Sequence, residues 1–372
     1  MHIGVPKEIK NHEYRVGLTP ESVAELIAQG HQVSVETQAG AGIGADDASY
    51  KTAGATILSA AAEVFDAAEM IVKVKEPQAV ERAMLKPHHL LYTYLHLAPD
   101  PEQTKDLVAS GATCIAYETV TGNEGGLPLL KPMSQVAGRM AVQAGATALE
   151  KSKGGRGVLL GGVPGVAPAR VLVLGGGVVG FNAAQMARGM GADVTIFDRS
   201  NVVLERLDNH FEGAVRTQYS TQAALAEAVK TADLVIGAVL IPGAAAPKLV
   251  TREMLSTMQA GAVLVDVAID QGGCFETSKA TTHADPTYEV DGIVHYCVAN
   301  MPGGVARTST YALNNATLPH ALALASKGWK QALKDDAHLA KGLNVWNGQV
   351  TEPHVAADLG YEFVSPETAM NS

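Results

Sequence analysis

The chain is poor in cysteine and in aromatic residues. It has 3 cysteines and 2 tryptophans in 372 residues, and Phe, Trp and Tyr together make up only 5%. Cys114, Cys274 and Cys297 do not have the spacing of a zinc site, and so few cysteines do not suit a disulfide-built secreted protein. We therefore expect free, packed thiols in a reducing compartment.

Positive charge is also scarce. Lys and Arg number 28 against 38 Asp and Glu, which gives a net charge of −10, and no long basic cluster occurs. This composition argues against nucleic acid as a partner. The N-terminus carries Lys7, Glu8, Lys10 and Arg15 where a secretory signal needs an apolar core. We expect a cytoplasmic protein.

Long apolar runs are nearly absent as well. Residues 171–187 carry no charge and approach the length of a membrane span. Four glycines inside this run, at positions 175, 176, 177 and 180, favour a buried strand, a turn and a helix instead. We therefore expect no membrane association.

What the chain has in abundance is glycine, with 38 residues, together with Ala and Val. Residues 171–174 are an apolar strand that runs into a G-x-G-x-x-G turn, which a predicted helix at 181–190 and a strand at 193–197 follow. Gly175 permits the turn, Gly177 lets backbone approach a pyrophosphate, and Gly180 lets the helix pack on the strand. The helix start offers N–H groups to phosphates. This order of elements predicts a dinucleotide site.

Asp198 stands 18 residues after Gly180, at the end of the next strand. Its carboxylate is placed to accept hydrogen bonds from the adenosine ribose hydroxyls. Its charge would repel a 2′-phosphate, so the sequence predicts NAD rather than NADP as the cofactor.

The fingerprint lies in the middle of the chain, and 372 residues favour two domains. Short apolar runs at 2–5, 32–36, 70–74, 90–95 and 113–117 alternate with helical patterns at 20–29, 60–68 and 101–110. Later strands are expected at 234–240, 262–269 and 293–298, and residues 134–151 form a long helical pattern. The region from 305 onward is mainly helical in pattern. Alternating βαβ units predict parallel sheets covered on both faces.

We therefore predict an α/β fold of two doubly wound, Rossmann-like domains whose parallel sheets face a shared cleft. Residues 1–130 and 305–372 would form a discontinuous substrate domain. Residues 131–304 would form the NAD-binding domain.

Ligands of such sheets bind beyond the carboxyl ends of the strands. In the first domain this rule selects Arg15, Lys75 and His96, and in the second it selects Asp198, Leu240, Asp270 and Asn300. Each has an alternative interpretation. Arg15 could be a surface arginine and His96 a structural histidine. Lys75 alternates with Lys73 and could lie on a solvated edge strand, and Asp270 could cap a turn. Asp266, inside a strand, is expected to be a buried structural acid.

The chain resembles bacterial alanine dehydrogenases, and the wider alanine dehydrogenase and transhydrogenase family, along essentially its whole length. The resemblance rests on residues 3–8 (IGVPKE), 13–16 (EYRV), 72–77 (VKVKEP), 95–97 (LHL), 132–139 (PMSQVAGR), 154–166 (GGRGVLLGGVPGV), 265–274 (VDVAIDQGGC) and 296–302 (YCVANMP). It implies NAD-dependent oxidative deamination of L-alanine to pyruvate and ammonia, the reverse amination, and a homo-hexamer.

The resemblance also implies roles for single residues. Arg15 would pair with the substrate carboxylate and Lys75 would polarise the carbonyl or imine, while His96 would act as acid and base and Asp270 would assist water. Positions where the family contacts NAD correspond here to Ser134, Gly175, Gly177, Val178, Val179, Gly180, Asp198, Ser220, Val239, Leu240, Val267, Ala268, Ile269, Asp270, Lys279, Val298, Ala299, Asn300 and Met301.

Two positions depart from the family pattern. Some members carry an acid and a histidine four residues apart after the position of Pro319, assigned to a divalent cation, but residues 321–327 read ALALASK here. We therefore expect no metal. Lys279 stands where relatives carry arginine, which keeps the charge but loses the bidentate fork.

Three other functions stay open. A transhydrogenase nucleotide-binding subunit would exchange hydride with a membrane-bound partner. A non-catalytic NAD-binding scaffold would keep the fingerprint without the polar residues of the first domain. A dehydrogenase of another small 2-amino acid would differ only in the shape of its pocket.

Overall fold

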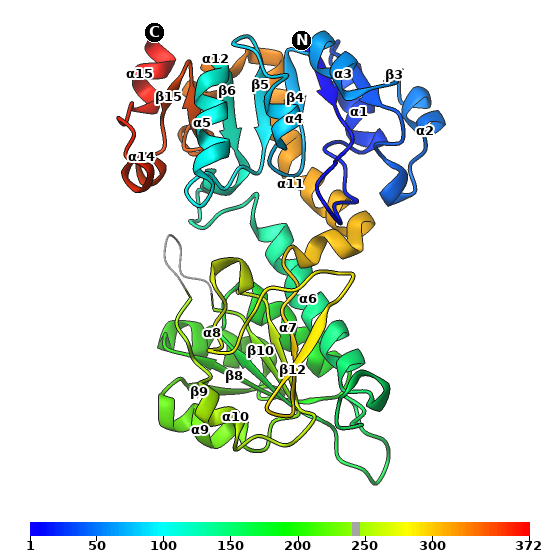
Figure 1. Cartoon of the computed structure of the whole chain (residues 1–372), viewed down its shortest axis with the longest axis vertical. Helices are drawn as coiled ribbons and strands as arrows, with labels where there is room; N and C mark the ends of the chain where they lie inside the picture. Colours follow the sequence, from blue (N-terminus) through cyan, green and yellow to red (C-terminus); the bar gives the residue numbers. More distant parts are fainter. Residues whose placement is uncertain (240–245) are drawn as a thin grey trace. The chain divides into compact units, whose positions relative to one another are not determined.

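A computed structural model describes residues 1–239 and 246–372. These residues form two compact units (Figure 1). The first unit consists of Met1–Met133 with Gly303–Ser372, so it contains both ends of the chain, and the second unit is Ser134–Pro302. Each unit is an α/β layer structure built on its own sheet.

The first unit has an eight-stranded sheet in the order β15-β14-β6-β5-β4-β1-β2-β3. Its strands are β1 (His2–Val5), β2 (Gln32–Glu36), β3 (Thr56–Leu58), β4 (Met70–Val72), β5 (Leu90–Thr93), β6 (Thr113–Ala116), β14 (Leu343–Trp346) and β15 (Gln349–Val350). Strands β1 to β6 pair in parallel. This parallel part confirms the doubly wound prediction.

The edge β14–β15 corrects two predictions, since its strands pair antiparallel and lie in a region expected to be helical. The two strands join through Asn347 and Gly348, both with positive φ (46° and 81°). An Asn-Gly pair is the usual signal of a two-residue hairpin turn. The sheet is therefore mixed rather than wholly parallel.

Helices lie on both faces of this sheet (Figure 1). Thr19 caps the first of them, because its hydroxyl accepts a 3.2 Å hydrogen bond from Ser22 N–H and Pro20 opens the helix. The helices are α1 (Pro20–Ala28), α2 (Asp47–Thr52), α3 (Ala61–Ala67), α4 (Ala79–Arg82), α5 (Pro101–Ser110), α11 (Ala306–Lys327), α12 (Trp329–Asp335), α13 (Ala337–Ala340), α14 (Pro353–Leu359) and α15 (Pro366–Asn371).

The second unit has a seven-stranded sheet in the order β12-β13-β11-β10-β7-β8-β9. Its strands are β7 (Arg170–Leu174), β8 (Asp193–Asp198), β9 (Arg216–Tyr219), β10 (Leu234–Gly237), β11 (Val263–Asp266), β12 (Thr287–Val290) and β13 (Ile293–Tyr296). Only β12 pairs antiparallel among the strands described, with β13. This sheet is therefore also mixed at one edge, where the sequence predicted parallel strands only.

The helices of the second unit are α7 (Val178–Gly189), α8 (Asn201–Phe211), α9 (Gln222–Val229) and α10 (Arg252–Leu255), and α6 (Lys131–Ala148) begins just before this unit. Buried side chains of α6, such as Ala141 and Val142, pack in one cluster with Val171 and Val173 of β7. A Cβ on Gly138 would meet the carbonyl oxygen of Val179 at 2.2 Å, so glycine is required where α6 crosses α7. The helix thus completes the core of the dinucleotide-type sheet.

The uncharged run at 171–187 divides between β7 and α7, as predicted. In the described part of the chain, no helix combines the length and the apolar character needed to cross a membrane.

Strand order reverses once in each sheet. In the first unit β1 has β2 on one side and β4 on the other, and in the second unit β7 has β8 on one side and β10 on the other. Such a reversal opens a crevice at the carboxyl edge, and ligands of open parallel sheets bind there. The loops after β1, β4, β7 and β10 are therefore the first places to look for a site.

Candidate active site

Three predicted catalytic residues follow three neighbouring strands of the first unit. Arg15 lies in the loop after β1, Lys75 shortly after β4 and His96 shortly after β5, and these strands are adjacent in the order β5-β4-β1. Because the three strands are parallel, their carboxyl ends share one edge of the sheet. The strand order reverses between β1 and β4, and Arg15 and Lys75 lie in the two loops that follow these strands.

Arg15 is not a surface arginine, since only 2% of its surface is exposed. Its Nε donates to Glu13 Oε1 at 2.7 Å and its Nη2 donates to Glu13 Oε2 at 2.6 Å. Although burial opposes the charged form, the hydrogen bonds and charge of Glu13 raise the pKa of Arg15. The Nη1 nitrogen points to Met133, with 3.0 Å to Sδ. Glu13 therefore fixes the guanidinium plane from one edge.

Lys75 and Lys73 differ sharply in burial, which contradicts the interpretation of a solvated edge strand. Strand β4 lies inside the sheet, and Lys73 is fully buried between Glu8 and Glu81. Burial opposes the charged form, but the two carboxylates together raise the pKa of Lys73. Lys75 is half-buried, and its backbone carbonyl accepts a 3.0 Å hydrogen bond from the hydroxyl of Thr93.

His96 lies in the third of these loops, between β5 and α5, with an exposed imidazole in an unusual backbone conformation. Its φ is +51°, in the left-handed region. Its backbone N–H donates to Glu118 Oε1 at 2.6 Å, and its Nδ1 lies 3.8 Å from the same oxygen. The ring of Tyr94 stacks on the imidazole with centroids 5.8 Å apart. The imidazole is thus oriented by a carboxylate and an aromatic ring while it stays open to solvent.

The glycine turn of the second unit has the geometry that the fingerprint requires. Gly175 has a φ of +102°, and a Cβ on Gly180 would meet the carbonyl oxygen of Gly175 at 1.8 Å. A Cβ on Gly177 would meet nothing within 4 Å, so the backbone there borders open space. Helix α7 begins at Val178 directly behind this turn. The residues present therefore fit a dinucleotide pyrophosphate.

Asp198 ends β8 next to this turn. Its Oδ2 accepts a 2.7 Å hydrogen bond from Gly176 N–H, and its Oδ1 accepts a 2.8 Å bond from Ser200 N–H. Arg206 of α8 donates to the Gly176 carbonyl at 3.0 Å. The acid is half-buried and rigidly placed, as recognition of ribose hydroxyls requires.

Asp270 lies in a short 3-10 helix (Ile269–Gln271) after β11, and it is exposed. The loop around it is folded on Asp266, whose carboxylate accepts backbone N–H groups from Ala268 at 3.0 Å and Cys274 at 2.9 Å. Asp266 is fully buried, which raises its pKa although these donors oppose the shift. Asp266 is thus the buried structural acid that the sequence predicted.

The other predicted cofactor residues occupy several segments of the second unit. Val239 follows β10 across the strand reversal from the glycine turn, whereas Leu240 lies outside the described residues. Ser220 follows β9, and Lys279 is exposed with its N–H donating to the Tyr288 hydroxyl at 2.7 Å. The remaining residues start helix α6 or α7, follow β11 or follow β13; they are Ser134, Val178, Val179, Val267, Ala268, Ile269, Val298, Ala299, Asn300 and Met301.

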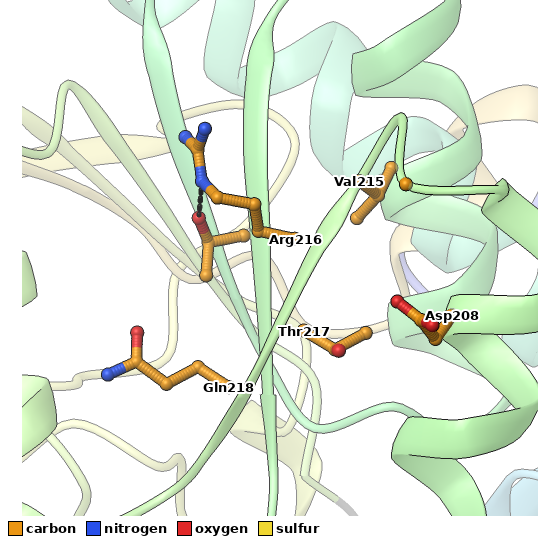
Figure 2. A pocket seen from close by; sticks show the side chains of 7 residues that line it. Asp208, Val215, Arg216, Thr217 and Gln218 are labelled. Carbon is orange, nitrogen blue, oxygen red and sulfur yellow. Dashed lines mark hydrogen bonds between the residues drawn. The ribbon is translucent and has the colours of Figure 1, made fainter.

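A shallow surface pocket of about 340 Å³ lies elsewhere in this unit, between α8 and β9 (Figure 2). Arg216 is one of the residues that line it, and its Nε donates a 3.4 Å hydrogen bond to the hydroxyl of Thr195. None of the predicted site residues lines it. Within residues 1–239 and 246–372, no group of three or more His, Cys, Asp or Glu side chains could hold a metal ion.

The sequence interpretation missed the acids that hold the candidate catalytic residues. Glu13, Glu8 and Glu118 are partners of Arg15, the Lys75 backbone and His96, respectively. Glu13 could have been found from its position two residues before an arginine. Glu8 and Glu118 act across 67 and 22 residues of sequence, and no local pattern reports that.

Two Rossmann-like units, one with a dinucleotide turn and the other with a cationic and imidazole edge, define a two-domain oxidoreductase. The chain belongs to the alanine dehydrogenase/PNT family: the family's N-terminal domain model matches residues 4–137 and its C-terminal domain model matches residues 141–353.

Individual relatives support this assignment. The chain is 64% identical to the alanine dehydrogenase of Halomonas elongata over 98% of both chains. It is 56% identical to that of Bacillus subtilis over 100% of this chain and 98% of the relative. Among solved structures, an L-alanine dehydrogenase matches with a TM-score of 0.94 and 53% identity, over 97% of this chain and 99% of that one. A transhydrogenase from Sinorhizobium meliloti matches with a TM-score of 0.81 and 26% identity, over 95% and 99%.

Proposed function

We propose that this chain is a NAD-dependent alanine dehydrogenase that oxidises L-alanine to pyruvate and ammonia and catalyses the reverse amination. The observation that carries the proposal is the presentation of Arg15, Lys75 and His96 by three adjacent strands of a unit. A non-catalytic scaffold has no need of that edge. The curated relatives named alanine dehydrogenase support the choice of substrate.

The proposed cofactor is NAD, held by the second unit. The turn from Gly175 to Gly180 and the start of α7 would hold the pyrophosphate, and Asp198 would hold the adenosine ribose. When bound, NAD supplies the two-electron acceptor for the oxidation of alanine. Hydride transfer to the bound cofactor would also require that water is partly excluded from the reacting atoms.

Arg15 and Lys75 would bind and polarise the substrate. A guanidinium is suited to a carboxylate because its planar fork makes two parallel hydrogen bonds. Glu13 holds the Nε–Nη2 edge of Arg15 and so orients the guanidinium that would pair with the substrate carboxylate. The Lys75 ammonium would polarise the carbonyl or imine. In the reverse reaction it would stabilise the negative charge that develops on the carbonyl oxygen when ammonia adds to pyruvate.

His96 would move the protons. Alanine arrives as an ammonium, and the imidazole would take one proton so that the neutral amine can donate electron density as the Cα–H bond breaks. Water then attacks the iminium carbon, Asp270 would orient that water, and the proton that the water loses on addition passes to solvent. The imidazole returns its proton to the amine of the carbinolamine. As ammonia leaves, the carbinolamine hydroxyl gives its proton back to the imidazole, and the carbonyl of pyruvate forms.

The transhydrogenase alternative is less supported, because identity to the transhydrogenase structure is 26% against 53% for the alanine dehydrogenase structure. We further propose a cytoplasmic homo-hexamer without a resident metal. Steady-state NADH formation with L-alanine, compared with L-serine, glycine and L-lysine, tests the proposal. We expect a clear preference for L-alanine. If no NADH forms with any of these amino acids, the proposed function is wrong.

A further inference from the structure

A lysine lies fully buried beneath the proposed catalytic edge, and it is paired with two acids. The Nζ of Lys73 is 2.9 Å from Glu8 Oε2 and 2.7 Å from Glu81 Oε1, and all three side chains are at most 2% exposed. Burial of three charges is costly and rarely chosen for stability alone. Stability alone therefore does not explain why Lys73, Glu8 and Glu81 are buried together.

The two acids use their remaining oxygen atoms differently. Glu8 Oε1 accepts from the backbone N–H groups of Val74 at 2.6 Å and Lys75 at 3.3 Å. Glu81 Oε2 accepts instead from Gln78 N–H at 2.7 Å, which closes the capping box of α4. Glu8 therefore touches the backbone of the proposed catalytic lysine, and Glu81 holds a helix end.

The peptide groups around Lys75 are fixed from other sides as well. The hydroxyl of Thr93 donates to the Lys75 carbonyl at 3.0 Å, and the hydroxyl of Tyr117 donates to the Lys73 carbonyl at 3.0 Å. Strand β4 ends at Val72, but the backbone around β5 still holds the next two residues: Lys73 N–H donates to the Tyr92 carbonyl at 3.2 Å, and Tyr94 N–H donates to the Val74 carbonyl at 3.3 Å. Glu8 supplies the acceptor for the next two N–H groups, those of Val74 and Lys75.

We propose that Glu8 is a positioning residue for the reaction: its carboxylate, held by Lys73, fixes the backbone of Val74 and Lys75 and so directs the Lys75 ammonium toward the substrate. This inference rests on the proposed function of Lys75. The position of a catalytic group matters, because a displacement of about 1 Å can lower the reaction rate ~100-fold.

The chain offers a matched control for this role. Glu8→Gln and Glu81→Gln each replace a buried carboxylate on Lys73 by an amide of equal size. In each variant the amide carbonyl can serve its backbone partner only if the NH2 group faces the ammonium of Lys73, which also donates. The two variants therefore lose similar stability, but only Glu8→Gln releases the backbone of Lys75.

The experiment compares both variants with the parent enzyme in the oxidation of L-alanine. We expect Glu8→Gln to lower kcat/KM for L-alanine at least ~10-fold more than Glu81→Gln does. A loss of this size is typical of a displaced catalytic group, and it should appear mainly in kcat. The Kd for NADH, a property of the second unit, should stay within ~2-fold in both variants.

A second variant covers the case in which Glu8→Gln folds poorly. In Glu8→Gln with Lys73→Met and Glu81→Gln, all three buried charges are removed and no ammonium opposes the first amide, so its carbonyl can turn to the Val74 and Lys75 N–H groups. Activity should then recover at least ~3-fold over Glu8→Gln alone. Equal loss in Glu8→Gln and Glu81→Gln, or no recovery in the triple variant, would overturn the inference. A parent enzyme inactive on L-alanine would overturn the proposed function itself.

Discussion

Glu118 Oε1 accepts a 2.6 Å hydrogen bond from the backbone N–H of His96, and the same oxygen accepts a 3.1 Å bond from Leu95 N–H. One carboxylate thus holds two consecutive peptide groups at the point where His96 takes a φ of +51°. Such a conformation is costly for a residue other than glycine and persists only where the surroundings impose it. We interpret it as the means by which the imidazole is presented for proton transfer.

Glu118→Ala should therefore impair catalysis without weakening cofactor binding. Loss of the acceptor frees the turn at His96, and we expect kcat for L-alanine to fall at least ~10-fold, the scale of a lost positioning contact. Glu102→Ala is the control, since that side chain of α5 is 83% exposed. Steady-state kinetics and NADH titration check both variants, and an unchanged kcat in Glu118→Ala would contradict the role.

The proposed direct roles of His96 and Lys75 predict larger effects. His96→Ala and Lys75→Ala should each lower turnover by at least ~100-fold, because acid-base catalysis contributes on that scale. Both residues lie in loops and neither side chain is fully buried, so the variants should keep the parent circular dichroism spectrum. Near-normal turnover in either variant would reject its assignment.

The choice between NAD and NADP should depend on Asp198. Asp198→Ala removes the acceptor for the ribose hydroxyls and the charge that repels a 2′-phosphate. We expect weaker use of NAD, by ~10-fold or more in kcat/KM, and a raised relative activity with NADP. The ratio of kcat/KM for the two cofactors measures this, and an unchanged ratio would count against the assignment.

The glycine turn offers a test that separates binding from folding. A Cβ on Gly177 meets nothing within 4 Å, and φ of −69° suits any residue. Gly177→Ala should therefore leave the free energy of unfolding unchanged but weaken NADH binding at least ~10-fold by obstructing the pyrophosphate. Gly180→Ala should instead destabilise the fold, because its Cβ would lie 1.8 Å from a carbonyl oxygen. NADH binding to Gly177→Ala at the parent Kd would argue against the site.

A fall in pH should lower the free energy of unfolding of the second unit, because His295 becomes protonated. This histidine is fully buried, and its ring nitrogens contact the Thr277 hydroxyl at 2.7 Å and the Ile293 carbonyl at 2.9 Å. Burial lowers its pKa from 6.5. Its contribution to stability is thus complete above pH 6.5 and is lost as the pH falls toward the lowered pKa, because the unfolded chain takes up the proton first.

The expected loss is at most about 1.4 kcal/mol per pH unit. His295→Asn should flatten this slope, as measured by urea denaturation between neutral and mildly acidic pH. An identical slope in the parent and the variant would show that another group is responsible.

Local patterns predicted most of the fold. The glycine turn, Thr19 as a helix cap and most strands of the parallel sheets follow from neighbouring residues. The β14–β15 hairpin was missed although Asn347 and Gly348 mark its turn, because its strands have only 4 and 2 residues and β14 pairs with β6, far away in the sequence. Alternation also could not distinguish Lys73 from Lys75, because a strand pattern gives the face of a side chain but not its partner.

The candidate catalytic residues themselves could be selected from the rule of strand ends. Their supporting acids could not, since Glu8 and Glu118 reach their targets only after the sheet has formed. Physical support of a site is a property of tertiary packing, and single-sequence patterns do not report it.

The purified protein is expected to oxidise L-alanine with NAD and without any partner protein. The stoichiometry of NADH, pyruvate and ammonia formed from L-alanine and NAD by the parent enzyme measures this. The proposed function predicts equal amounts of the three products. NADH without pyruvate and ammonia, or no NADH at all, would contradict it.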